Sequence, residues 1–173
     1  METATTLVHL DSPFINFRDH DFGAGSHGYR WVNVKRFRLA SGTGSDRDVL
    51  AALIAHPQFR DTYDGGGVQD WPRHGQWWLE RITPDTYESI GADAATELVR
   101  AWAAQHGDVP ESLLARLGQE LYTPLRQATA CYVLGHLPEE AQHDYGPLHT
   151  DYHELVLIDR RTSTVTLAVA ADD

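Results

Sequence analysis

The segment from His143 to Glu154 gathers three histidines and three carboxylates into twelve residues. If this segment is extended, His149, Asp151 and His153 share one face, because strand side chains alternate between the two faces. Imidazole and carboxylate groups bind zinc and iron(II), so these residues indicate a site for a divalent metal. They also suit catalysis by proton transfer, with Asp151 orienting a histidine that acts as acid or base.

The segment from His143 to Glu154 need not form a site by itself. The dipeptide Gly146-Pro147 is typical of a loop, and histidines in a loop can simply be solvated. A second polar loop, residues 18–28, carries His20 and His27 and can complete a ligand-binding site or remain a flexible surface loop. Its Gly23–Gly28 stretch matches G-x-G-x-x-G, but no helical pattern follows, so we expect no nucleotide cofactor.

Tryptophans provide a different kind of candidate. Trp71, Trp77 and Trp78 fall within eight positions, next to the Gly65-Gly66-Gly67 run. Adjacent residues of a strand face opposite sides, so Trp77 and Trp78 cannot belong to the same layer of the core. An exposed member of this group can line a ligand pocket or anchor a protein partner. The alternative is that helices cover both residues.

Several catalytic signatures are absent from the sequence. The positions after His153-Glu154 lack the second histidine of H-E-x-x-H, and there is no G-x-S-x-G motif. Gly42–Ser45 lacks the lysine of a phosphate-binding loop. The single cysteine, Cys131, rules out an internal disulfide framework, and its apolar surroundings favour a buried, inert thiol.

Composition narrows the classes of partner. The chain has 173 residues, with 14 basic and 25 acidic side chains and a net charge of −11. This balance argues against nucleic acid and against anionic membrane surfaces, and it favours a small molecule or a basic protein as partner. The N-terminus lacks the pattern of a signal peptide and no apolar run is long enough to span a bilayer, so we expect a cytoplasmic protein. Arginine makes up 13 of the basic residues, as in GC-rich bacterial genomes.

Helices and strands follow from apolar periodicity. Residues 5–39 read as extended segments, and Ser45 predicts a helix N-cap ahead of an apolar stripe that ends at Pro57. Residues 76–82 read as a strand. Thr83-Pro84 predicts a helical turn that continues to Gly91. Further helices are expected over residues 93–106 and from Pro110 to Pro124, then a strand over 129–137 and a terminal hairpin from 155–158 and 164–170.

Strands at both ends with helices between them indicate one α+β domain over residues 1–173. We expect a mainly antiparallel sheet with three to four helices packed on one face.

Two functional hypotheses follow. The first is a small enzyme or ligand-binding protein, with His149, Asp151 and His153 as the catalytic or metal-binding centre. In this hypothesis the ligand is bound by His20, His27, Trp71, Trp77 and Trp78. The second is an acidic protein-recognition module, such as an immunity or inhibitor protein or a subunit of a bacterial assembly. The sequence leaves the substrate, the metal and the oligomeric state open.

Overall fold

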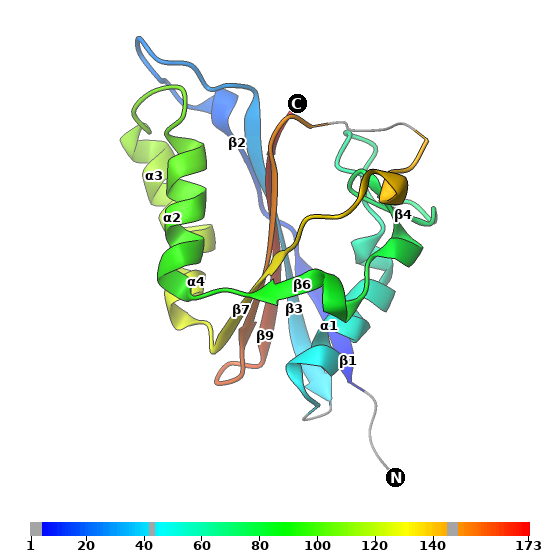
Figure 1. Cartoon of the computed structure of the whole chain (residues 1–173). Coiled ribbons are helices and arrows are strands. Elements are labelled where there is room, and N and C mark those ends of the chain that lie inside the picture. The colour runs from blue at the N-terminus through cyan, green and yellow to red at the C-terminus, as the bar shows by residue number, and fades with distance from the viewer. Residues whose placement is uncertain (1–4, 42–43, 145–148) are drawn as a thin grey trace.

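The computed structural model describes residues 5–41, 44–144 and 149–173. Its central feature is an antiparallel sheet in the order β1-β3-β9-β8-β7-β6, with β2 paired to β3 beside β1 (Figure 1). The strands of this sheet are β1 (Thr6–Asp11), β2 (Phe14–Asn16), β3 (Arg30–Ser41), β6 (Tyr87–Ser89), β7 (Ala130–Leu134), β8 (Tyr152–Asp159) and β9 (Thr164–Asp172). The predicted α+β class with a mainly antiparallel sheet is confirmed.

The terminal hairpin forms the middle of the sheet. β8 pairs with β9 from Tyr152 opposite Ala171 to Asp159 opposite Thr164, as the predicted hairpin requires. Both strands are buried on both faces over most of their length. Their continuous apolar character follows from this position, since a strand covered on both faces needs no polar side.

One face of the sheet is covered by helices α2 (Ala92–Ala103), α3 (Glu111–Leu117) and α4 (Thr123–Gln127). A π-helical segment, Gly118–Tyr122, joins α3 to α4. Trp102 of α2, together with leucines spaced four residues apart from Leu113 to Leu125, packs against sheet residues such as Leu155 and Val32. Pro124 does not end this helical stretch, because it lies in the first turn of α4, where no backbone N–H is needed.

The opposite face is covered by α1 (Asp46–Ala55) and by the short hairpin of β4 (Arg73–His74) and β5 (Trp77–Trp78). Figure 1 shows α1 and β4 across the sheet from α2, α3 and α4. The predicted N-cap at Ser45 is confirmed, with a complete capping box to Asp48. The expectation that the helices share one face does not hold, because the apolar side of α1 packs on the other face of the central strands.

The middle of the chain is less regular than its sequence pattern indicates. Only Trp77–Trp78 of the predicted strand is extended, and a 3₁₀ turn, Leu79–Arg81, follows. The Thr83-Pro84 helix start is confirmed as a single 3₁₀ turn, Pro84–Thr86. The chain then enters β6 instead of continuing as a helix. Three further 3₁₀ turns are Phe17–Asp19, Pro57–Phe59 and Glu139–Ala141.

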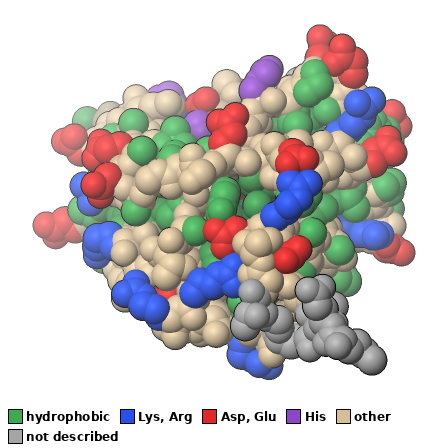
Figure 2. All heavy atoms as spheres, turned by 60° about the horizontal axis from the view of Figure 1, so that its bottom comes forward, with side chains coloured by type: hydrophobic (Ala, Val, Ile, Leu, Met, Phe, Trp, Pro, Cys, Tyr) green, Lys and Arg blue, Asp and Glu red, His purple; other side chains and the backbone are tan. Residues whose placement is uncertain are grey.

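The surface mixes charges of both signs. On the face shown in Figure 2, acidic and basic side chains are interspersed, with hydrophobic atoms between them. This face carries no continuous basic patch among the residues drawn in colour. None of the helices in the described ranges has the length and apolar character needed to cross a membrane.

Candidate functional site

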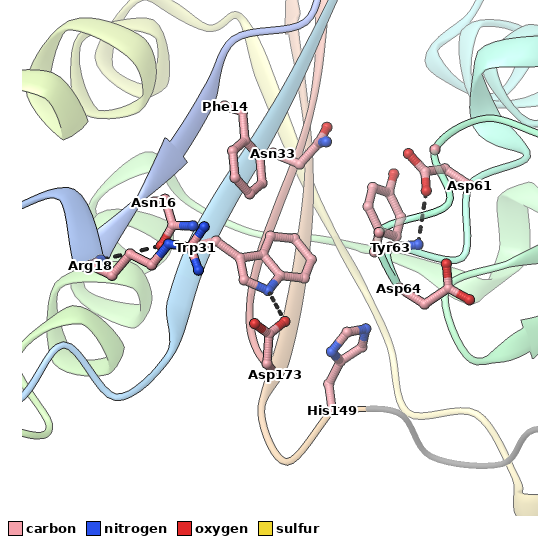
Figure 3. Close-up of a pocket in the computed structure, with 12 residues that line it drawn as sticks. Phe14, Asn16, Arg18, Trp31, Asn33, Asp61, Tyr63, Asp64, His149 and Asp173 are labelled. Carbon is pink, nitrogen blue, oxygen red and sulfur yellow. Dashed lines mark hydrogen bonds between the residues drawn. The ribbon is translucent and has the colours of Figure 1, made fainter.

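A pocket of about 590 Å³ opens where β2 and the start of β3 meet the loop after Asp61. Figure 3 shows Trp31 in the middle of this site, with Phe14 on one side of it and Asp173 and His149 on the other. The pocket is lined by Phe14, Asn16, Arg18, Trp31, Asn33, Asp61, Tyr63, Asp64, Gly65, Gly67, His149 and Asp173. We call this space the β3 pocket.

Aromatic rings form the apolar part of the β3 pocket. The Trp31 and Tyr63 rings stack with their centroids 5.9 Å apart, and the Phe14 ring lies 6.0 Å from that of Trp31. The indole N–H of Trp31 donates a hydrogen bond of 3.0 Å to Asp173, which fixes the ring at the pocket wall. A concave site with aromatic walls and a few polar groups is the usual form of a small-molecule site.

Tyr63 occupies an unusual backbone conformation at this site. Its φ of 60° lies in the left-handed region, which is costly for a bulky residue. The Asp61 carboxylate accepts a hydrogen bond of 2.8 Å from the Tyr63 backbone N–H and holds the turn. Residues kept in such conformations cluster at functional sites.

The Tyr63 hydroxyl is buried without a hydrogen-bond partner among the described residues. The residue is only 6% exposed, yet it lines the β3 pocket. Burial, together with the nearby Glu154 and Asp61 charges, raises the pKa of Tyr63 well above its ordinary value. The hydroxyl therefore stays protonated and is a hydrogen-bond donor.

His149, which also lines the β3 pocket, has a second unpartnered polar atom. Its Nδ1 lies 2.5 Å from the backbone oxygen of Asp172, which can only accept, so Nδ1 carries a proton. In the neutral ring Nε2 is then an acceptor, and this atom is buried without a partner in the described part of the chain. The ring is fixed edge-on to Trp31 and stacked on Tyr152, with centroid distances of 5.5 and 5.9 Å.

A buried ion pair supports the Tyr63 turn from behind. Lys35 Nζ donates to Asp61 at 2.9 Å and to the backbone oxygen of Gln58 at 2.8 Å, and it lies 5.0 Å from the centre of the Tyr63 ring. Burial lowers the pKa of Lys35, against the opposing effect of the Asp61 carboxylate. The pair fixes Asp61, and through it the backbone of Tyr63.

A second buried network supports His149. Glu154 on β8 accepts hydrogen bonds from Tyr152 at 2.6 Å, from Tyr87, and from the ring of His74 at 2.5 Å. The other ring nitrogen of His74 lies 2.5 Å from the Phe59 backbone oxygen. Burial alone would raise the pKa of Glu154, but the His74 charge and these hydrogen bonds outweigh it and lower that pKa. The ionised carboxylate holds Tyr152 in place under the His149 ring.

His149 also lines a second, smaller pocket of about 280 Å³. Its other walls include Gln76, Trp77, His136 and Glu154. Trp77, a predicted ligand-binding residue, is 7% exposed here, with its ring edge-on to Tyr152 at 4.9 Å. His149 is therefore shared by two cavities.

The structure separates the other two residues of the predicted His/Asp centre from His149. Asp151 lies 3.9 Å from the buried Arg30 guanidinium, and the His153 ring lies edge-on to Trp102 in the layer of α2. The alternation argument fails for His149 because this residue precedes β8, which begins only at Tyr152. Within the described ranges, no three His, Cys, Asp or Glu side chains are grouped to hold a metal ion.

The remaining predicted ligand-binding residues lie outside the lining of the β3 pocket. His20 bonds to Ser112 at 2.7 Å, and His27 accepts a hydrogen bond of 3.0 Å from the Tyr29 backbone N–H. The ring centres of Trp71 and Trp78 lie 5.1 and 5.4 Å from the Arg73 guanidinium carbon.

The predicted inert thiol fits the structure. Cys131 is buried, and burial raises the pKa of the thiol.

Sequence reasoning missed Lys35, Asp61, Tyr63, His74 and Glu154. Two signals were present in the sequence: Lys35 is the only lysine and occupies an inward position of an apolar strand, and Glu154 opens a fully apolar run. Asp61, Tyr63 and His74 lie in irregular segments without periodicity, so no comparable signal marks them.

Comparison of the chain with protein-family models, with curated proteins and with solved structures gave no match.

Proposed function

We propose that this protein binds a small organic molecule in the β3 pocket. The observation that carries the proposal is that two residues lining this pocket, Tyr63 and His149, are each at least nine-tenths buried and each holds a polar side-chain atom without a hydrogen-bond partner among the described residues. Burying the Tyr63 hydroxyl and His149 Nε2 without partners costs about 1–3 kcal/mol each. A ligand that bonds to both atoms recovers this free energy on binding.

The chemistry of the pocket supports the same conclusion. The Tyr63 hydroxyl is a donor, His149 Nε2 is an acceptor, and the rings of Trp31 and Phe14 offer apolar contact. The Lys35–Asp61 pair and the Glu154 network hold these groups in place before any ligand arrives, which lowers the entropic cost of binding. The sequence predicts that His149 acts as an acid or base together with Asp151 and His153. In this proposal His149 keeps that role, and Tyr63 is its neighbour in the site instead of Asp151 and His153.

The experiment is a ligand-observed NMR screen of a fragment library against the wild-type protein and Tyr63→Phe. We expect fragments that bind the wild type and lose at least about tenfold in affinity to the variant, since one buried hydrogen bond is lost. The control is Tyr122→Phe, because Tyr122 is also buried but packs in the layer on the opposite face. Fragments that bind all three proteins equally, or no binding at all, would contradict the proposal.

A second candidate function is recognition of a basic protein partner. Trp71 is 41% exposed and Val68 is 40% exposed, and the Arg73 guanidinium holds the Trp71 ring. Exposed tryptophans are common anchors of protein interfaces, and the net charge of −11 favours a basic partner. Trp71→Ala should abolish co-purification of such a partner at low salt, whereas Tyr29→Ala, at another exposed aromatic, should leave it intact.

A further inference from the structure

Given that the β3 pocket binds a small molecule, we infer that its ligand is an arylalkyl amine, with the aliphatic ammonium group at His149 and the ring against Trp31 and Phe14. This inference rests on the proposed function and adds the chemical class of the ligand. It follows from the hydrogen-bonding state of His149, the charges of the pocket wall and the aromatic character of the remaining surface.

His149 selects a ligand that donates a hydrogen bond. Because the Asp172 carbonyl oxygen fixes the proton on Nδ1, the neutral ring offers only an acceptor to the cavity. The 9% exposure of the residue leaves little access for bulk water to this atom. A ligand carboxylate or phosphate would place an acceptor against an acceptor.

The charges around the pocket also favour an ammonium group on the ligand. Its lining residues include three carboxylates, Asp61, Asp64 and Asp173, against one guanidinium, Arg18. Asp61 is neutralised by Lys35. Asp64 is exposed, and although partial burial acts against it, the hydrogen bond from the Gly66 backbone N–H and the nearby His143 lower the pKa of this carboxyl, which therefore stays ionised. Asp173 is exposed and accepts only the Trp31 indole N–H among the described side chains. The lining therefore carries more carboxylates than cationic groups, which favours a cation over an anion.

The aromatic walls favour a cation attached to a planar body. Rings attract both apolar surface and positive charge to their faces. Phe14 is 49% exposed, so its ring remains available to a ligand. Figure 3 shows the Phe14 ring and the His149 ring on opposite sides of Trp31, which places the apolar and polar ends of the site apart.

Calorimetric titration of three compounds with one shared ring tests the inference. Tryptamine carries an ammonium on an indolyl-ethyl chain, tryptophol a hydroxyl, and indole-3-propionate a carboxylate. We expect tryptamine to bind at least about tenfold more tightly than indole-3-propionate, with tryptophol between them, as expected for one charge-assisted hydrogen bond. The preference for tryptamine should shrink in Asp64→Asn, an exposed substitution that leaves the fold intact, and in His149→Phe.

The outcomes separate the inference from the proposed function. Equal or tighter binding of indole-3-propionate, with displacement of a β3-pocket fragment, would overturn the amine class and leave a small-molecule pocket. Failure of all three compounds to bind, while other fragments bind in a Tyr63-dependent manner, would also overturn the class alone. If the whole fragment library fails as well, the proposed function fails with it. Loss of tryptamine binding in His106→Phe, a control outside the pocket, would contradict the assignment to His149.

Discussion

The Nδ1 atom of His149 lies 2.5 Å from the backbone carbonyl oxygen of Asp172, at the end of the central strand β9. A hydrogen bond from the His149 side chain to the backbone of β9 thereby determines which ring nitrogen carries the proton. Asp172 is held in place as the last residue of β9, where it pairs with Arg30 of β3.

The first prediction concerns that tautomer. We expect Nδ1 of His149 to carry a proton, because the Asp172 carbonyl oxygen can only accept a hydrogen bond. Long-range ¹H–¹⁵N spectra of histidine-labelled protein report the tautomer directly, and His149→Phe assigns the signal. A signal showing Nε2 protonated would remove the acceptor from the pocket.

The second prediction compares the Tyr63 hydroxyl with those of Tyr152 and Tyr87, which bond to Glu154. Tyr63→Phe should leave the free energy of unfolding unchanged or raise it, because the lost hydroxyl has no partner. Tyr152→Phe should lower it by about 1.5–3 kcal/mol, because it removes a hydrogen bond to a charged carboxylate. Tyr87→Phe should behave like Tyr152→Phe. Urea unfolding measures all three, and an equal loss in Tyr63→Phe would mean that its hydroxyl is satisfied in the folded protein.

The third prediction concerns the buried ion pair. Lys35→Met should destabilise the fold by about 3–5 kcal/mol, because Asp61 is left charged and buried. Arg47→Met removes one partner of the exposed pair with Asp85 and should have little effect, because solvent screens that pair. Chemical unfolding measures the free energy of unfolding of both variants. Equal losses in Lys35→Met and Arg47→Met would contradict our account.

The fourth prediction is a pH dependence that comes from Glu154. Its pKa is lowered in the folded state, so its stabilising contribution is present above the unfolded value of 4.5 and is lost as the pH falls through the folded value. Glu154→Gln should therefore be less stable than the wild type at neutral pH, and the difference should shrink in acid. Glu88→Gln, at an exposed position, should follow the wild-type curve. A constant difference between Glu154→Gln and wild type across this range would show that Glu154 is not ionised in the fold.

The fifth prediction tests the packing beside Tyr152. Gly75 has a φ of 56°, and a Cβ there would lie 3.0 Å from the Tyr152 hydroxyl and 3.2 Å from the Trp77 ring. Gly75→Ala should lower the free energy of unfolding more than Gly23→Ala. Gly23 is the matched control, because its φ of 59° is close to that of Gly75 but a Cβ there would meet nothing within 4 Å. Equal losses would indicate backbone strain alone and no displacement of Tyr152.

Local patterns in the sequence account for the scaffold. The Ser45 cap, the apolar stripe of α1 and the periodicity of α2 are all properties of neighbouring residues, and the structure confirms them. The terminal hairpin was predictable for the same reason.

The site depends on contacts between distant parts of the chain. His74 meets Glu154 across 80 positions and Lys35 meets Asp61 across 26, and neither pairing leaves a periodic signal. The clustering of histidines near the C-terminus indicated His149 correctly as a candidate. It could not show that Asp151 and His153 would lie on the side of α2, because the start of β8 was not evident from composition.

The most direct test of the central proposal is a crystal structure with the tightest fragment from the NMR screen. We predict electron density for the fragment in the β3 pocket, with polar atoms within hydrogen-bond distance of the Tyr63 hydroxyl and His149 Nε2. Density at another surface only, with the β3 pocket holding no fragment, would contradict the account.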